Sequence, residues 1–501
     1  MSTWEREWLK QCVCHGRNLE TEAHNVTPSE PLDLQFGSAV TLAYDGRVAP
    51  KETPLLELTK DPIPKTLGLM ALLTSLGMLA LVGFGVADAL FVGMLGEVPL
   101  AALTYAFPVL VGSSAVGVGL GIGAEAVLAP VVGRGDKTAI QRTATQLLVF
   151  ATGLSIVLSA AMALMATPYP LWMGANHEVA PLVTLYINLW LLSTPPLIVA
   201  LVGGGMARTI GDPQTPAIVM VICALLNIAL DPLLIFGLDG WVPAYGFEGA
   251  AYATLATKVL AGVWCYGLFV RKYQLLSLDP QTFQNGWANL KEMLRLGTPA
   301  MGVQCMVPLG HSIILKLLST AGTGVVAAFG LAVQIESLGL LGCAALNLSL
   351  GPFVGQHMGA QLYPRIREGF IWAQKVALVY TLSVATLMWL GGPKLWPMLH
   401  GSVEVTDALA IILFLQPFSF LPEGARMITS PFFNNTGTSL PPLVLLASQF
   451  FLVMLPLALL LSPSMGWTGI IMAWVIARWV ISAVALLWLR AHLKTRGIFT
   501  T

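Results

Sequence analysis

The sequence predicts an all-α polytopic membrane protein whose twelve transmembrane helices form two parallel six-helix repeats. Three observations predict this fold class: the composition, the number of long apolar runs, and motifs that recur at a similar offset. Of the 501 residues, 56% are hydrophobic and only 10% are charged, whereas soluble domains carry roughly 25% charged residues. Lys and Arg together number 26, as do Asp and Glu, so the charge balance gives no indication of nucleic-acid binding. We therefore expect the chain to fold in a lipid bilayer.

Twelve apolar runs are each long enough to cross a bilayer, which requires about 20 mostly apolar residues. In chain order they cover residues 66–94, 104–132, 143–166, 180–206, 214–238, 247–270, 296–319, 325–355, 369–391, 404–429, 440–462 and 467–489. Pro195, Pro196 and the glycines at 203–205 lie within one run. Such residues are typical of membrane helices that bend or pack closely.

Residues 1–62 differ from the rest of the chain because they are polar and mixed in charge. They contain no apolar stretch of the kind that a secretory signal needs, so we expect a regulatory or disordered extension. Cys12, Cys14 and His15 are spaced closely enough to bind a metal. No second Cys/His cluster lies nearby, so the six cysteines are interpreted as small hydrophobic residues.

Basic residues gather in every second loop between the predicted spans. If residues 1–65 are cytoplasmic, the cytoplasmic loops and tail carry Arg134, Lys137, Arg142, Arg208, Arg271, Lys272, Lys291, Arg295, Arg365, Arg367, Arg490, Lys494 and Arg496. The opposite loops carry only Lys394. The positive-inside rule therefore predicts that both termini face the cytoplasm.

Short motifs recur along the chain at similar offsets. Pro-Val-Val-Gly at 130–133 is followed 222 residues later by Pro-Phe-Val-Gly at 352–355. Gly-Phe-Glu-Gly at 246–249 is followed 220 residues later by Gly-Trp-Thr-Gly at 466–469. An even number of spans per half makes the repeats parallel, and proteins of this kind often bind substrate between their halves. The alternative is chance similarity between Gly- and Pro-rich membrane segments.

These repeats predict how the chain divides into domains. A polar N-terminal extension covers 1–62, and the first six-helix bundle covers 63–270. A cytoplasmic linker at 271–294 is the longest polar stretch between spans, and it leads to the second bundle at 295–493. A short tail at 494–501 completes the chain.

Two acids lie inside long apolar runs, Asp88 in the first span and Asp231 in the fifth. A carboxylate in hydrocarbon is expensive, so it normally faces a polar cavity and binds or relays a cation. Asn227 precedes Asp231 by four residues and shares its helical face, which supplies the oxygen ligands that Na⁺ prefers. Two carboxylates in one cavity also favour uptake of a proton. The alternatives are that Asp231, beside Pro232, marks an interfacial turn and that Asp88 reaches water near its helix end.

Four stretches resemble the multidrug and toxic compound extrusion (MATE) family. They are ADALFVGMLG at 87–96, ARTIGDPQTP at 207–216, LNIALDPLLIFG at 226–237 and GFEGAAYAT at 246–254. The resemblance covers about residues 65–495, and its details are similar to the DinF-like branch of the family.

This resemblance implies twelve helices in a V-shaped pair of bundles and cation-coupled export of organic compounds. In DinF-like members, the N-terminal bundle holds a site for H⁺ or Na⁺. Carried over motif by motif, that site comprises Asp88, Asn227, Asp231 and Thr254. The loop before the sixth span is long in this chain, which makes Thr254 the loosest of the four matches.

A few other polar residues in the spans are predicted to line a substrate cavity. They are Glu125, Tyr105, Gln334 and Glu336. Glu125 stands where similar family members carry small residues, so it would add a third acid to the first bundle. Anchoring at the membrane interface is the alternative for Tyr105, and a structural salt bridge is the alternative for each acid.

Charged residues of the second half are expected to pair with one another. Glu423 and Arg426 are three residues apart and share a helical face, so we expect an ion pair between them. Lys316 and Glu336 lie in neighbouring predicted spans and are a second candidate pair. No acid motif of the NorM type stands out in this half, which keeps the predicted cation site in the first half.

The predicted function is secondary active export of organic compounds by antiport with H⁺ or Na⁺. The chain has no Walker A motif and no HExxH motif, so neither an ATP-driven pump nor a zinc hydrolase is expected, and we predict no enzymatic activity. The alternatives are a lipid-linked precursor flippase, which would need a strongly basic central cavity, and a passive channel, which would need no coupling acid. The substrate would be a drug-like cation or an organic anion.

The remaining predictions concern cofactors, partners and location. We expect no cofactor other than the coupling ion, H⁺ or Na⁺, and partners limited to the bilayer and a small organic substrate. The protein is expected to be a monomer in the plasma membrane or in a membrane of a eukaryotic organelle such as a plastid.

Overall fold

The computed structural model describes residues 56–238, 241–277, 279–399 and 403–498. Every regular element in these ranges is helical apart from an isolated bridge between Leu238 and Val242, so the predicted all-α fold class is confirmed. The polar extension predicted at 1–62 lies almost wholly outside the described residues, together with Cys12 and Cys14. Its predicted disorder and the metal-binding alternative stay predictions.

The first half of the chain contains six long helices. They are α2 (Ile63–Gly93), α3 (Glu97–Arg134), α4 (Lys137–Ala166), α6 (Val179–Thr209), α7 (Gln214–Ile235) and α8 (Phe247–Gly267). A short helix, α5 (Tyr169–Trp172), follows α4, and a π-helical turn, η1 (Leu268–Lys272), extends α8. The linker to the second half contains the 3₁₀ turn η2 (Pro280–Phe283).

The second half repeats this order with more broken helices. It contains α9 (Gly286–Leu318), η3 (Ser319–Ala321), α10 (Thr323–Gly339), α11 (Leu341–Gly359), α12 (Tyr363–Leu399), α13 (Val403–Leu415), η4 (Gln416–Ser419), α14 (Phe420–Asn435), α15 (Leu440–Ser448), η5 (Gln449–Met454), α16 (Leu455–Met465) and α17 (Trp467–Thr495). The run predicted at 325–355 is not one straight helix, because α10 and α11 meet at a bend of 46°.

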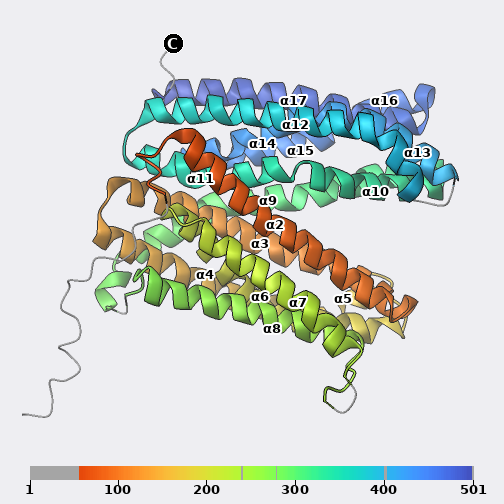
Figure 1. The fold of residues 1–501 in the computed structure, drawn as a ribbon, viewed down its shortest axis with the longest axis horizontal. Helices are drawn as coiled ribbons and strands as arrows, with labels where there is room; N and C mark the ends of the chain where they lie inside the picture. The colour runs from red at the N-terminus through yellow and green to blue at the C-terminus, as the bar shows by residue number, and fades with distance from the viewer. Residues whose placement is uncertain (1–55, 239–240, 278, 400–402, 499–501) are drawn as a thin grey trace, which may run out of the picture. The chain divides into compact units, whose positions relative to one another are not determined.

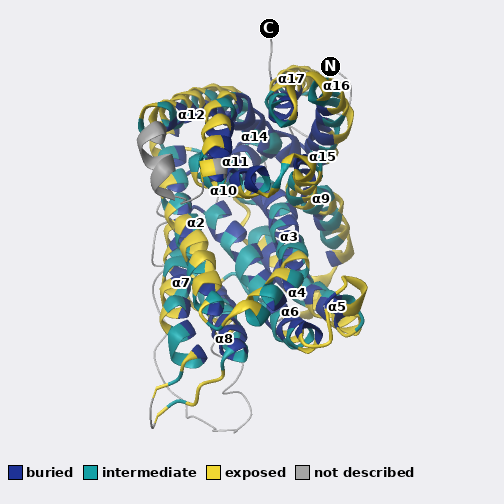
Figure 2. Cartoon of the chain, turned by 90° about the vertical axis from the view of Figure 1, so that its right-hand side faces the viewer, coloured by how far each residue is buried: buried dark blue, intermediate teal, exposed yellow. Residues whose placement is uncertain are grey.

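In the described part of the chain, eleven helices are long and apolar enough to cross a bilayer. The bent pair α10 and α11 makes a twelfth if it counts as one span, which is the predicted number. Exposed apolar side chains line the outer faces of these helices, among them Leu79 on α2, Leu390 on α12 and Leu452 on η5. Figure 2 shows exposed positions along α2 and α12 in particular. Such faces suit lipid, because water would not tolerate apolar patches of this extent.

Equivalent pairs of helices pack together in the two halves. In the first half, α6 packs on α3, α4 and α8, while α7 packs on α2 and α8. In the second half, α14 packs on α11, α12 and α17, while α15 packs on α9 and α16 packs on α17. Figure 1 shows α4, α6, α7 and α8 in the lower part of the view and α12 to α17 in the upper part, while α2 runs obliquely from the upper left to the lower right. The repeated sequence motifs therefore correspond to a repeated arrangement of helices.

The two halves meet along α2, α3, α9 and α11, and each half contributes its first two spans to the contact. The recurring motif at 130–133 and 352–355 lies at this interface. A Cβ atom added at Gly133 would overlap the Gln356 carbonyl, and one added at Gly359 would overlap the Pro130 carbonyl. Glycine is therefore required where α3 and α11 cross, since only it lets the two backbones approach so closely.

Candidate ion and substrate site

A cluster of polar side chains lies between four helices of the first half, and we call it the acid cluster. Three of these helices each contribute two residues four positions apart, so that both members of a pair lie on one helical face. The members are Asp88 on α2, Tyr186 and Trp190 on α6, Asn227 and Asp231 on α7, and Thr254 and Lys258 on α8. The packing of α7 on α2 and α8, and of α8 on α6, brings them together.

Asn227 connects α7 to α8. With its amide nitrogen facing Asp231, it donates to the carboxylate oxygen Oδ2 at 3.0 Å, and its own oxygen accepts from the backbone N–H of Thr254 at 3.3 Å. Asp88 on α2 lies close enough to Asp231 on α7 for the two carboxyl groups to interact electrostatically. The structure thus brings together all four residues that the family resemblance placed in the cation site.

Several buried polar atoms of the acid cluster have no hydrogen-bond partner among the described residues. They are Oδ1 of Asp88, Oδ1 of Asp231, the hydroxyl oxygens of Tyr186 and Thr254, and Nζ of Lys258. A buried polar atom without a partner costs free energy, and it is rare in folded proteins. Five such atoms in one cluster leave hydrogen-bonding capacity that the described protein groups do not use.

Lys258 and Tyr186 are members of this cluster that the sequence did not lead us to predict. Nζ of Lys258 lies 2.8 Å from the centroid of the Trp190 ring, which is a cation–π contact, and it interacts electrostatically with Asp88. The sequence held a signal for it, because Lys258 is a lysine inside the predicted span 247–270 and follows Thr254 by four residues. The family motif stops at Thr254, so the resemblance did not lead to it.

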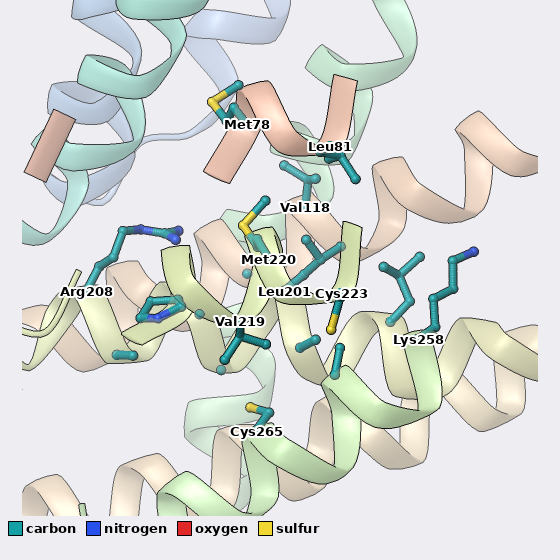
Figure 3. A pocket seen from close by; sticks show the side chains of 18 of the residues that line it. Met78, Leu81, Val118, Leu201, Arg208, Val219, Met220, Cys223, Lys258 and Cys265 are labelled. Carbon is teal, nitrogen blue, oxygen red and sulfur yellow. The ribbon is translucent and has the colours of Figure 1, made fainter. Parts of the chain in front are cut away.

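A cavity of about 240 Å³ lies beside the acid cluster, between α2, α3, α6, α7 and α8. Most of its wall is apolar or sulfur-containing, as at Leu201, Met220 and Cys223. Figure 3 shows Lys258 on one side of the view and Arg208 on the other, with these side chains between them. Asn227, Thr254 and Lys258 line the cavity, whereas Asp88 and Asp231 are not among its lining residues. The cavity and the acid cluster therefore share three side chains.

Glu125 lines the same cavity and forms an ion pair with a basic residue. Its Oε2 lies 3.9 Å from Nη2 of Arg208 on α6, and the side chain of Glu125 is buried while that of Arg208 is partly buried. Glu125 also lies against Gly351 of α11, where an added Cβ would overlap its carboxylate. Glu125 is thus part of an α3–α6 ion pair next to the second half.

The other predicted cavity residues lie away from this cavity. Tyr105 is half-buried on α3, where its carbonyl accepts from the Tyr169 hydroxyl. Gln334 is exposed on α10. Glu336 is buried, and it accepts hydrogen bonds from Gln416 at 2.6 Å and from Arg478.

The charged residues of the second half form what we call the arginine cluster. Arg478 on α17 pairs with Glu336 and lies 3.8 Å from Glu423, while its guanidinium packs 4.3 Å from the centroid of the Trp474 ring. The predicted pair between Glu423 and Arg426 is confirmed at 2.5 Å. The predicted pairing of Glu336 with Lys316 is wrong. Glu336 lies on the buried face of α10, which α17 approaches, whereas Lys316 is exposed on α9.

The chain is similar to a known protein family and to individual proteins over most of its length. The MatE family model matches residues 74–233 and 299–460, one stretch in each half. A relative from Shewanella oneidensis named FAD transporter is 30% identical over 417 residues, covering 83% of this chain and 92% of the relative. A relative from Thermotoga maritima named probable multidrug resistance protein NorM is 25% identical over 402 residues, covering 78% of this chain and 84% of the relative.

Solved structures of transporters share the fold. The Vibrio cholerae MATE transporter VcmN in its bent form superimposes with a TM-score of 0.81 and 25% identity over 87% of this chain and 99% of that chain. A transporter of the MOP superfamily from Pyrococcus furiosus gives a TM-score of 0.82 and 25% identity over 89% of this chain and 98% of that chain.

The two six-helix repeats, the apolar outer faces and the buried acids define a multi-pass integral membrane protein of the transporter class. Within that class the chain belongs to the MATE family, since the family model matches in both halves and the similarity to the Shewanella relative extends over most of both chains.

Proposed function

We propose that the protein is a secondary active exporter of organic compounds that works by antiport with H⁺ or Na⁺. The acid cluster would bind the coupling ion, and the two halves would alternate the side of the membrane to which the cavity opens. The observation that carries this proposal is the group of unpartnered buried polar atoms at Asp88, Asp231, Tyr186, Thr254 and Lys258, next to an apolar cavity. Polar groups buried within a membrane protein are expensive to maintain and commonly mark an ion pathway.

The cavity and the relatives support an organic substrate. An apolar wall with a few polar groups is typical of sites for small organic molecules. The cargo named for the relatives, drugs and FAD, consists of organic molecules. We propose drug-like cations and organic anions as the two substrate classes to test. The details of the first-half motifs support placing the chain in the DinF-like branch.

The two other functions have less support. A lipid-linked precursor flippase would need a strongly basic cavity, whereas Arg208 and Lys258 are the basic residues that line the described cavity, and Glu125 offsets one of them. A passive channel would have no use for the acid cluster. The transporter names of the relatives also support a protein that is not an enzyme.

The topology and the location are part of the same proposal. The distribution of basic residues supports cytoplasmic termini. We propose a monomer in the plasma membrane or in an organelle membrane, without a cofactor other than the coupling ion. Labelling of a single cysteine added at either terminus, in intact cells and in permeabilised cells, tests the orientation.

Transport by the purified protein in liposomes tests the function. A fluorescent organic cation and FAD serve as the two probes, with an imposed gradient of pH or of Na⁺. Wild-type protein should accumulate at least one probe against its gradient, and Asp231→Asn should not. Asp279→Asn, which removes an exposed carboxylate in the linker, is the matched control. Equal accumulation by wild type and Asp231→Asn would exclude a role for this carboxylate in coupling.

A further inference from the structure

The segment that leads into α2 is attached to both halves of the protein, and we call residues 56–62 the clasp. Leu56 and Leu58 are 2% and 1% exposed, and they pack with Met70 of α2 in a small cluster that is separate from the larger apolar cores. The backbone N–H of Leu56 donates to the Gly211 carbonyl at 3.2 Å. Gly211 lies in the loop between α6 and α7, so the clasp is bound to the first half.

The loop that accepts this hydrogen bond is itself held in place by the first half. Asp212, the residue after Gly211, accepts hydrogen bonds from Lys272 at 2.9 Å and from the Tyr273 hydroxyl at 2.9 Å. Lys272 ends the π-helical turn η1, and Tyr273 follows it. The first-half attachment of the clasp is therefore tied to the end of α8 as well as to α6 and α7.

Arg365 on α12 attaches the other end of the clasp to the second half. Its Nη2 donates to the Asp61 carbonyl, and its Nε donates to Nε2 of His357 at 3.0 Å. His357 is fully buried on α11, where its Nδ1 lies 2.7 Å from the Phe353 carbonyl. With its proton on Nδ1, the imidazole donates to that carbonyl and accepts from the arginine. His357 thus orients the side chain that holds the clasp.

The clasp lies at the end of the bundle where the two halves share apolar cores. Ile63 and Leu67, at the start of α2, are buried in a core of the second half. Met293 of α9 is likewise buried in a core of the first half. The two other large clusters, around Tyr186 and around Trp474, each contain residues of one half only. Among the described residues, the halves are therefore joined by shared cores near the clasp and not at the far end of α2.

We propose that the clasp holds the two halves together at this end, and that it detaches when the cavity opens to that side of the membrane. This inference rests on the proposed function, because it takes the two halves to alternate the access of the cavity. The attachment to the second half is polar, and the two leucines lie in a cluster of their own. The clasp can therefore detach without opening a large apolar core. Since α2 also carries Asp88, the clasp and the acid cluster act on the same helix.

Distances between spin labels on the two halves test this proposal without any transport. The labels are attached at Lys137→Cys on α4 and at Glu368→Cys on α12, two exposed positions. The full chain is used, with its own cysteines replaced by alanine. The distribution of distances between the two labels then reports how far apart the halves lie at the end of the bundle that carries the clasp.

Two variants each remove one attachment of the clasp. Arg365→Met cannot donate to the Asp61 carbonyl, and the double variant Leu56→Ala/Leu58→Ala loses the apolar contacts with Met70. Arg367→Met, at an exposed arginine two residues further along α12, is the matched control. Elution as a single species in gel filtration shows that each variant is folded.

We expect a short distance to dominate in wild type and in Arg367→Met. In Arg365→Met and in the double leucine variant, the ratio of longer to shorter distances should rise about fivefold or more, because a hydrogen bond from a charged group or a buried leucine contributes at least that factor. An unchanged distribution in either variant, or an equal change in Arg367→Met, would overturn the proposal. Distances that change as expected in a protein that moves no substrate in liposomes would instead contradict the proposed function.

Discussion

The two halves of the protein each bury a cluster of charged side chains, but they match the charges differently. In the arginine cluster, Glu336 and Glu423 each accept a hydrogen bond from an arginine. In the acid cluster, Asp88 and Lys258 each keep a buried polar atom without a hydrogen-bond partner. Nε of Arg478 has no hydrogen-bond partner either, but Arg478 forms ion pairs with Glu336 and Glu423. We therefore expect the arginine cluster to hold helices together and the atoms of the acid cluster to be available for a ligand.

The repeat extends this comparison, because positions that correspond between the two halves carry different side chains with different partners. Lys258 and Arg478 are 220 residues apart, as are Lys272 and His492. Lys272 donates to the Asp212 carboxylate at 2.9 Å in the first half, while His492 contacts the Thr436 hydroxyl at 2.9 Å in the second. The same arrangement of helices therefore supports a charged contact in one half and a neutral one in the other.

Arg478→Met should have the largest effect on stability. It would leave the buried carboxylates of Glu336 and Glu423 with one basic partner fewer, and breaking a buried ion pair costs about 3–5 kcal/mol. Thermal unfolding in detergent should show a large fall in Tm, and adding Glu336→Gln should recover part of it. An unchanged Tm for Arg478→Met would show that the arginine cluster does not hold the second half together.

Gly133→Ala should weaken the contact between the halves. The added methyl group would overlap the Gln356 carbonyl on α11, and forcing extra volume into a close contact costs about 1–3 kcal/mol. Gly112→Ala is the matched control, because Gly112 also lies in α3 and a Cβ there meets no neighbour within 4 Å. Crosslinking between cysteines placed at the ends of α3 and α11 should become slower in Gly133→Ala and not in Gly112→Ala.

Asp212→Asn should have a smaller, pH-dependent effect. Burial alone would raise the pKa of Asp212, but hydrogen bonds from Thr215 and Lys272 outweigh it and hold the pKa below its ordinary value of 3.8. A carboxylate with a lowered pKa stabilises the fold above its ordinary pKa, and this contribution is lost as the pH falls through the lowered value. At neutral pH the substitution should cost roughly 1–3 kcal/mol, as expected for hydrogen bonds to a charged group.

The measurement for Asp212 is Tm as a function of pH. The difference in Tm between wild type and Asp212→Asn should be constant above pH 5 and should shrink as the pH falls below 4. A difference that stays constant down to pH 3 would show that the charge of this carboxylate does not stabilise the loop between α6 and α7.

Lys258→Met should have the smallest effect on stability and completes the comparison with Arg478→Met. A buried polar nitrogen without a hydrogen-bond partner costs free energy that an apolar side chain does not, so we expect Tm to stay the same or to rise slightly. A loss of stability as large as that of Arg478→Met would show that Lys258 is a structural residue, and it would remove the contrast between the two clusters.

The fold was predictable from the sequence because its signals are local. Apolar runs mark the spans, and recurring motifs such as the one at 130–133 mark the repeat. The bend between α10 and α11 was missed, because no proline lies at residues 339–341 to indicate it. Glu423 and Arg426 could be paired from their spacing on one helix. The partner of Glu336 could not, because Arg478 is 142 residues away and only the packing of α17 brings it close.

The acid cluster was predictable only in part. Asn227 and Asp231 stand out as polar residues four apart in an apolar run, whereas Tyr186 looks like an ordinary aromatic residue of a membrane helix. Lys258 carried a readable signal, its spacing from Thr254. Its lack of a hydrogen-bond partner depends on the surroundings that α2, α6 and α7 create, and no local pattern reports that.

The most direct test of the account measures transport and stability on the same preparations of wild type, Asp231→Asn and Glu336→Gln. Each protein is reconstituted at equal density, and uptake is driven by an imposed pH gradient. We predict that Asp231→Asn keeps its Tm and loses gradient-driven uptake, while Glu336→Gln loses stability and keeps uptake per folded molecule. Uptake that survives in Asp231→Asn and fails in Glu336→Gln would contradict the central claim that the unpaired cluster of the first half couples transport to the ion gradient.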